Sequence, residues 1–303
     1  MRSWLSPATV PVGIGDDAAV APVSPGASLV ASADAMVEDV HFRWSWSAPG
    51  DVGWKAVTVN VSDIAAMGAV PRWILVTLGA PPGTGEDILR GLYEGMEEAC
   101  RQYECEIVGG DTVRTESVLV AITALGEIEG DPLRRSGAKV GDTIAVTGSL
   151  GRAACGLNLL MSGDATKGSP RDALVCIDAH RRPVARVREG RALLTAGAHA
   201  AIDLSDGLAS DVRRLAEASG VGVELSVVPT APEAKRIAEA RGWDAEAMTL
   251  GGGEDMELLV ALPPGVEGAG NLVPIGRVVD EGLWLLRDGE RVRLPDVGWD
   301  HFG

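Results

Sequence analysis

Four short stretches of the chain place carboxylates where an apolar segment ends. They are "GIGDDAAV" (Asp16, Asp17), "ASADAMVEDVHF" (Asp34, Glu38, Asp39, His41), "NVSDIAAMGA" (Asn60, Asp63) and "VGGDTVR" (Asp111). A fifth stretch, "AIDLSDGLASD", adds Asp203, Ser205, Asp206 and Asp211. Burying a carboxylate without a partner costs on the order of several kcal/mol. These acids therefore need compensating groups.

Divalent cations are the compensating groups that the sequence favours. Basic residues close to these acids are few, namely Lys55 and Arg114. Oxygen ligands favour Mg²⁺ or Mn²⁺ over zinc, and Mg²⁺ usually takes one or two carboxylates together with water and substrate phosphate. Scattered aspartates therefore predict several Mg²⁺ ions bridged by a polyphosphate. For a single aspartate such as Asp51 or Asp206, a helix cap is the more frequent role.

Two glycine-rich stretches stand beside acids, "GGD" at 109–111 and "GGGED" at 251–255. One interpretation is a turn whose backbone N–H groups bind phosphate while the acid holds a metal, and a plain tight turn explains them equally well. The stretch "GIGDDA" fits the dinucleotide pattern GxGxxA. We reject that reading because no strand precedes it and two aspartates would face the pyrophosphate.

Two domains are predicted to position these residues. In the first half, β-branched apolar runs predict strands near 18–23, 28–34, 71–79, 105–109 and 117–128. Helical periodicity predicts helices over 51–69 and 85–103, the first with Asn60 and Asp63 on one face. The order of these predicted elements along the chain, β-β-α-β-α-β-β, indicates an α+β domain with both helices on one face of its sheet. The other face would be bare in a single chain, so we expect a homodimer.

A polar, turn-rich segment at 130–142 marks the domain boundary, giving domains 1–130 and 131–303. The second half alternates strands and helices, which predicts an α/β domain with a mixed sheet. Its predicted strands lie at 142–148, 200–205, 221–228, 256–262, 272–279 and 283–286, and its predicted helices at 150–161, 187–197 and 206–219.

The composition narrows the class of protein. The 303 residues carry a formal net charge of -16, which disfavours a nucleic-acid partner because DNA and RNA are polyanions. There is no run of 18 apolar residues and no signal-like N-terminus, so we expect no membrane association and a cytoplasmic location. The four cysteines, at 100, 105, 155 and 176, lack the spacing of a zinc site.

Seven segments together resemble one enzyme family. They are "GIGDDAAV", "KAVTVNVSDIAAMGAVPRW", "IVGGDTVR", "RRSGAKVGDTIAVTGSLG", "AIDLSDGLASD", "GGGED" and "GWDHF". In this order, from about Gly13 to Phe302, they resemble the thiamine-monophosphate kinases. The wider superfamily includes aminoimidazole ribonucleotide synthetase, selenophosphate synthetase and a hydrogenase-maturation protein. Selenophosphate synthetases carry a reactive cysteine or selenocysteine near the N-terminus, whereas here no cysteine precedes Cys100. The hydrogenase-maturation protein ends in a reactive cysteine, whereas this chain ends "GWDHFG".

The resemblance implies a fold, an activity and a site. It implies an N-terminal ferredoxin-like ATP- and Mg²⁺-binding domain that joins its copy in a dimeric β-barrel, followed by the α/β domain. By similarity, metal-ligand positions are Asp17, Ser32, Asp34, Asp63, Asp111, Asp203 and Asp206. ATP-contacting positions are Gly110, Asp111, Arg135 and Ser205, and substrate-contacting positions are His41, Glu254 and Trp299. Where the family usually has a threonine, Ala33 leaves only a backbone carbonyl as a ligand.

The implied reaction is ATP-dependent phosphorylation of thiamine monophosphate to thiamine diphosphate. A phosphate monoester has a second pKa of about 6, so its attacking oxygen is largely ionised and no general base is required. The remaining obstacle is repulsion between two polyanions, which Mg²⁺ ions relieve in a direct in-line transfer. Two alternatives are another ATP-dependent synthetase of this superfamily acting on a different small phosphate, and a non-catalytic nucleotide or metal sensor.

Overall fold

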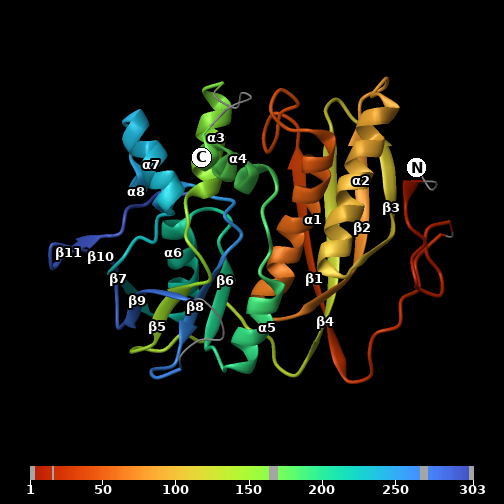
Figure 1. The fold of residues 1–303 in the computed structure, drawn as a ribbon. Helices are drawn as coiled ribbons and strands as arrows, with labels where there is room; N and C mark the ends of the chain where they lie inside the picture. Colours follow the sequence, from red (N-terminus) through yellow and green to blue (C-terminus); the bar gives the residue numbers. More distant parts are fainter. Residues whose placement is uncertain (1–3, 16, 164–169, 267–271, 300–303) are drawn as a thin grey trace. The chain divides into compact units, whose positions relative to one another are not determined.

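The computed structural model describes residues 4–15, 17–163, 170–266 and 272–299 (Figure 1). The chain divides into two compact units. The first unit contains Met1–Ile64 and Ala69–Asp131, and the second contains Ala65–Gly68 and Pro132–Gly303. No helix in the described part of the chain is long and apolar enough to cross a membrane.

The first unit is a four-stranded sheet with two helices. Its elements in chain order are β1 (Ala27–Val37), α1 (Pro49–Ala66), β2 (Val70–Ala80), α2 (Glu86–Tyr103), β3 (Glu106–Arg114) and β4 (Leu119–Glu129). The sheet order is β1-β4-β2-β3, with β2 and β3 parallel and the other pairs antiparallel. A ferredoxin-like domain instead runs β-α-β-β-α-β, so that label is wrong for this unit. Because β2 and β3 are parallel, α2 must serve as the crossover between them.

The predicted strand near 18–23 is also wrong. Among the described residues it forms only a single bridge, Val12 with Val20. Pro22 cannot donate to a ladder, and Val20 and Val23 are 54% and 44% exposed. The apolar run therefore has no sheet face to bury. The other strands and both helices predicted for this unit are present, and α1 ends as expected before Gly68, whose φ is +73°.

Both helices cover one face of this sheet (Figure 1). The alternate residues Val120, Ile122 and Ala124 of β4 are buried beneath them. The opposite row is open, with Leu29 and Val113 52% and 40% exposed. The sequence therefore located the covered and the open face correctly, as the alternation of each strand requires.

Close contact between α1 and α2 depends on glycine. A Cβ at Gly95 would lie 1.9 Å from the backbone oxygen of Gly50, and one at Gly53 would lie 2.0 Å from that of Leu92. We expect Gly95→Ala to lower the free energy of unfolding by about 1–3 kcal/mol, because the helices must separate. Urea unfolding measures the change. Gly50→Ala is the control, since its Cβ would have its nearest neighbour at 3.7 Å, and an equal loss in both variants would contradict the prediction.

The second unit is built on a seven-stranded mixed sheet of order β11-β10-β7-β9-β5-β8-β6, in which β10 and β7 are parallel. Its strands are β5 (Thr143–Val146), β6 (Ala200–Asp203), β7 (Gly222–Leu225), β8 (Leu258–Leu262), β9 (Val273–Val279), β10 (Leu283–Arg287) and β11 (Glu290–Arg293). Its helices are α3 (Arg152–Met161), α4 (Arg171–Arg181), α5 (Val187–Thr195), α6 (Leu208–Ser219), α7 (Pro232–Arg241) and α8 (Ala245–Gly251). The sequence patterns predicted every one of these except α4, α7, α8 and β11.

Both faces of this sheet are buried. On one face, Val212 and Leu215 of α6 pack with Ile144 and Ile202. On the other face, Leu193 of α5 packs with a cluster that includes Val260. The strands β5, β6 and β8 are short, almost entirely apolar and buried, as is typical of strands covered on both sides, whereas β11 at the edge is exposed. This arrangement confirms the predicted mixed sheet with helices. Packing on both faces also holds the end of β6 in place, where several candidate site residues lie.

Candidate functional site

The first unit brings β1 and α1 together through candidate site residues. Ser32 donates a hydrogen bond from Oγ to the Asp63 carboxylate. The backbone N–H of Asp34 donates to Asn60 Oδ1 at 2.8 Å, and Asn60 Nδ2 donates to the backbone oxygen of Ala56 at 3.0 Å. Ser32 and Asp34 belong to the same row of β1 because strand residues alternate between faces. The predicted shared helix face of Asn60 and Asp63 therefore lies against β1.

The "GGD" stretch at 109–111 is not a turn, contrary to our interpretation. Gly109, Gly110 and Asp111 lie inside β3, paired with Leu75, Val76 and Thr77. A Cβ at Gly110 would lie 1.8 Å from the Val76 backbone oxygen, and Gly110 has a φ of +144°. Glycine is therefore required for the approach of two strands. Three strand spacings separate β3 from β1, which amounts to about 14 Å.

His41 is held beside the end of β1. Its Nδ1 accepts the backbone N–H of Val37 at 3.1 Å, and the imidazole is half-buried. A neutral imidazole that accepts at Nδ1 carries its proton at Nε2, which is then a donor. Asp17 is exposed, and Asp16 lies outside the described residues.

In the second unit, Asp203 is buried at the end of β6 and Asp206 follows in the turn to α6. Asp206 does not cap α6, since the N-cap is Gly207 with a φ of +112°. Both Asp206 and Asp211 instead pair with Arg214, which the sequence reasoning overlooked although it lies only three residues after Asp211 on the predicted helix. The buried carboxylate of Asp211 also accepts the N–H groups of Ser205 and Asp206 at 3.2 Å each. Burial raises its pKa to about 6.

The "GGGED" stretch packs against the β6–α6 turn. A Cβ at Gly253 would lie 2.2 Å from the Ser205 backbone oxygen. The N–H of Glu254 donates to that same oxygen at 2.9 Å, and the N–H of Met256 donates to Leu204 O at 3.0 Å. These two amides therefore hold the turn itself and are not available to a phosphate. Glycine at 253 is needed for close packing.

Trp299 reaches the same turn from the end of the described chain. Its N–H donates to the backbone oxygen of Asp206 at 3.0 Å, and the residue is 50% exposed. The remaining residues of the "GWDHF" segment, from position 300, lie outside the described residues. Backbone hydrogen bonds thus join Glu254 and Trp299 to Ser205 and Asp206, although these segments are about 50 to 95 positions apart in the sequence. No local spacing in the sequence indicates this proximity, although the family resemblance assigned these residues to one site.

Arg135 lies away from the β6–α6 turn. It is exposed, and its backbone oxygen accepts from Ser219 Oγ at 3.0 Å at the last residue of α6. Asp206 precedes the first turn of that 12-residue helix. The two ends of such a helix are about 18 Å apart. The base beside Asp206 in the described chain is Arg214.

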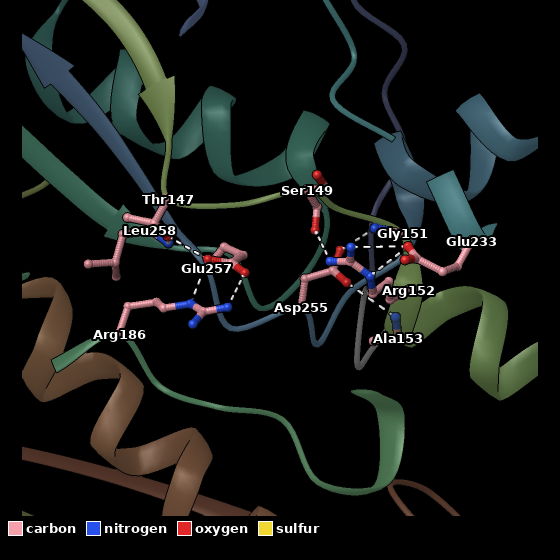
Figure 2. A network of polar contacts seen from close by, with 10 residues as sticks. All are labelled: Thr147, Ser149, Gly151, Arg152, Ala153, Arg186, Glu233, Asp255, Glu257 and Leu258. Carbon is pink, nitrogen blue, oxygen red and sulfur yellow. Dashed lines mark hydrogen bonds and ion pairs between the residues drawn. The ribbon is translucent and has the colours of Figure 1, made fainter. Parts of the chain in front are cut away.

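Two acidic residues that follow Glu254 in the chain, Asp255 and Glu257, make further polar contacts (Figure 2). Asp255 accepts the N–H groups of Gly151 and Ala153 at 2.6 and 3.2 Å, at the start of α3. Glu257, 3% exposed, accepts from Arg186 Nε at 2.7 Å and from Thr147 Oγ1 at 2.6 Å. Sequence reasoning missed Glu257 and Arg186, since 71 positions separate them.

Asp255 makes stability depend on pH. Burial raises its pKa from 3.8 to about 6, against the opposite effect of the two N–H donors. The folded state therefore binds this proton more tightly than the unfolded state, so the contribution of Asp255 to stability falls as pH rises from about 4 to 6 and is constant above. Asparagine does not titrate, so the Asp255→Asn variant lacks this contribution to the pH dependence of stability. We expect the unfolding free energy of the variant, relative to the original protein, to rise across that window in urea titrations; parallel pH profiles would contradict it.

The described residues contain no group of three or more His, Cys, Asp or Glu side chains placed to hold a metal ion by themselves. The structure does bring together two sets of candidate residues. In the first unit, Ser32, Asp34, Asn60 and Asp63 lie where β1 meets α1. In the second unit, Asp203, Ser205 and Asp206 lie at the β6–α6 turn, to which Glu254 and Trp299 are joined by backbone hydrogen bonds.

Comparison with known proteins identifies the class of this fold. The family model described as AIR synthase related protein, N-terminal domain, matches residues 15–128, and that of the C-terminal domain matches residues 139–282. The chain is thus a two-domain AIR synthase related protein. The two matches cover the first sheet almost entirely and the second sheet from β5 to β9, while β10 and β11 follow the end of the second match.

Full-length relatives identify the family more narrowly. The chain is 41% identical over 307 residues to a thiamine-monophosphate kinase of Mycobacterium tuberculosis, covering 100% of this chain and 89% of the relative. It is 42% identical over 254 residues to that of Bacillus subtilis, covering 82% and 77%. A solved structure, AaThiL complexed with AMPPCP and TMP, is 35% identical with a TM-score of 0.85, covering 93% and 90%. The chain belongs to the thiamine-monophosphate kinase family.

Proposed function

We propose that this protein transfers the γ-phosphate of ATP to thiamine monophosphate and forms thiamine diphosphate. The observation that carries the proposal is the full-length likeness to thiamine-monophosphate kinases, together with the 0.85 TM-score to a relative solved with AMPPCP, an ATP analogue, and TMP. No residue of the described chain needs to act as a base, because the acceptor phosphate is largely ionised above its second pKa of about 6. The protein has to bind and align two anions.

The two sets of candidate residues fit Mg²⁺. Their donors are carboxylate and hydroxyl oxygens, which this hard cation prefers, and the small number in each set matches an ion that keeps water and phosphate ligands. We assign Ser32, Asp34, Asp63, Asp17 and Asp111 of the first unit, and Asp203 and Asp206 of the second, to metal binding. Bound Mg²⁺ supplies charge neutralisation between donor and acceptor phosphates.

The remaining residues position the substrates. By family resemblance, Gly110, Asp111, Arg135 and Ser205 contact ATP. His41 presents a donor at Nε2, which suits an anionic phosphate. Glu254 offers a carboxylate for an N–H donor, and the half-exposed ring of Trp299 offers a stacking surface for a thiamine ring.

The open face of the first sheet supports a homodimer. Leu29, Ala31, Ala33 and Ala35 of β1 share this face with Leu119, Ala121 and Leu125 of β4, since the paired residues of an antiparallel ladder lie on one side. An apolar sheet face of this kind is buried in most proteins. We assign it to a second copy of the chain, the two sheets closing into a β-barrel. The cytoplasmic location stays a prediction from the sequence.

Release of ADP tests the function. The purified protein with ATP and Mg²⁺ is given thiamine monophosphate and, in parallel, a panel of other small phosphorylated acceptors. Thiamine monophosphate should give by far the largest rate and yield thiamine diphosphate by mass spectrometry. A larger rate with another acceptor would assign the protein to a different reaction of the superfamily, and ATP binding by calorimetry without turnover on any acceptor would indicate a sensor.

A further inference from the structure

Glu254 has a strained backbone. Its φ is +68°, and that of Met256 is +51°, in the left-handed region that residues other than glycine rarely adopt. Each such residue costs on the order of 1 kcal/mol, and it persists only where the surroundings impose it. The sequence offers three glycines directly before Glu254, yet glutamate occupies the strained position. Strain retained at a charged, partly exposed side chain indicates a use for that side chain.

Separate contacts fix the backbone around Glu254. Its N–H bonds to Ser205 O, the N–H of Met256 bonds to Leu204 O, and the Asp255 carboxylate is tied to the start of α3. None of these contacts orients the Glu254 carboxylate itself. That group needs a partner of its own.

His180 of α4 provides this partner. Its Nδ1 lies 3.1 Å from Glu254 Oε2, with the side chains 4% and 27% exposed. The buried ring thus contacts the inner side of a carboxylate that reaches the surface. Carboxylate oxygens have about four acceptor sites, so contact with His180 leaves room for a ligand donor. His180 lies 74 positions before Glu254 in the sequence, so no local spacing connects the two residues.

We propose that His180 is a positioning residue for substrate recognition: it orients the Glu254 carboxylate to accept a hydrogen bond from the amino group on the pyrimidine ring of thiamine monophosphate. The inference rests on the proposed function, in which Glu254 contacts that substrate. His180 acts through Glu254, so its loss should weaken binding of the thiamine substrate and leave ATP binding unchanged.

The test compares steady-state kinetics of the full-length enzyme and of His180→Leu, His180→Asn, Glu254→Ala and the His180→Leu/Glu254→Ala double variant. His180→Leu should raise the KM for thiamine monophosphate roughly 10-fold or more, as for loss of the buried partner in a close contact with a carboxylate, with the KM for ATP unchanged. Asparagine keeps an N–H donor near the position of Nδ1 and should restore most of the affinity. In the double variant, His180→Leu should add little to the effect of Glu254→Ala.

Ile177→Val is the control on the same helix, since Ile177 is 2% exposed and its change alters packing only. Thermal unfolding shows which variants are folded. A rise of both KM values, an additive effect in the double variant, or no difference between leucine and asparagine would overturn the inference while the kinase activity of the original protein stands. An original protein that turns over ATP but not thiamine monophosphate would overturn the proposed function and the inference with it.

Discussion

Asp63→Asn should abolish turnover while the protein stays folded. Asparagine has the size of aspartate, and its Oδ1 can accept the hydrogen bond that Ser32 gives to Asp63. It lacks the negative charge with which Asp63 is assigned to hold Mg²⁺. Loss of such electrostatic alignment should lower kcat/KM by about a thousandfold or more. ADP release measures the activity, and thermal unfolding should give a melting temperature close to the original.

Asp87→Asn is the matched control for this change. Asp87 is an exposed aspartate in the first turn of α2, and its replacement costs only a few tenths of a kcal/mol through the helix dipole. It should keep full activity. If Asp63→Asn retained most of its turnover, or lost it only by unfolding, the assignment of Asp63 as a metal ligand would be wrong.

Arg186→Leu should markedly lower the stability of the second unit. Glu257 is 3% exposed, and without Arg186 its buried charge loses its ionic partner (Figure 2). Breaking a buried pair costs about 3–5 kcal/mol; the Arg186 side chain is 31% exposed, so we expect about 2–4 kcal/mol. Urea unfolding measures the loss. Adding Glu257→Gln removes the uncompensated charge and should recover part of it.

Arg277→Leu is the control for an arginine of a similar pair. Glu224 is as buried as Glu257, but it pairs with both Arg277 and Arg291. Removing one of two exposed arginines leaves the charge compensated, so the cost should stay below about 1 kcal/mol. Equal losses for Arg186→Leu and Arg277→Leu would show that the buried pair has no special weight.

The sequence located the acids but not all of their partners. Asn60 and Asp63 were predictable as neighbours because residues three apart share a helix face. The same rule joins Asp211 to Arg214, three residues further along α6, but that pair was overlooked, and only the structure shows that Arg214 also pairs with Asp206. The "GGD" stretch was predicted as a turn, but it lies inside β3. Glycine marks close backbone approach as well as turns, and only the neighbouring strand or loop shows which applies.

For the fold as well, local patterns in the sequence predicted some elements and not others. Periodicity identified the two helices of the first unit and most strands, because burial of one face imposes a repeat on the sequence itself. The run at 18–23 has the composition of a strand, but it lacks a sheet to join. The helices α4 and α7 were not predicted, although α4 carries His180.

By itself the sequence determined which residue types are available, the two-domain α and β architecture, and membership of an enzyme family through motifs that are local in the chain. The tertiary structure alone decided that Glu254 and Trp299 adjoin Asp206, that Arg186 neutralises Glu257, and that His180 contacts Glu254. The physical reason is that local patterns record which face of an element is buried. Contacts between elements depend on strand pairing and helix packing over many tens of residues, and no local spacing encodes them.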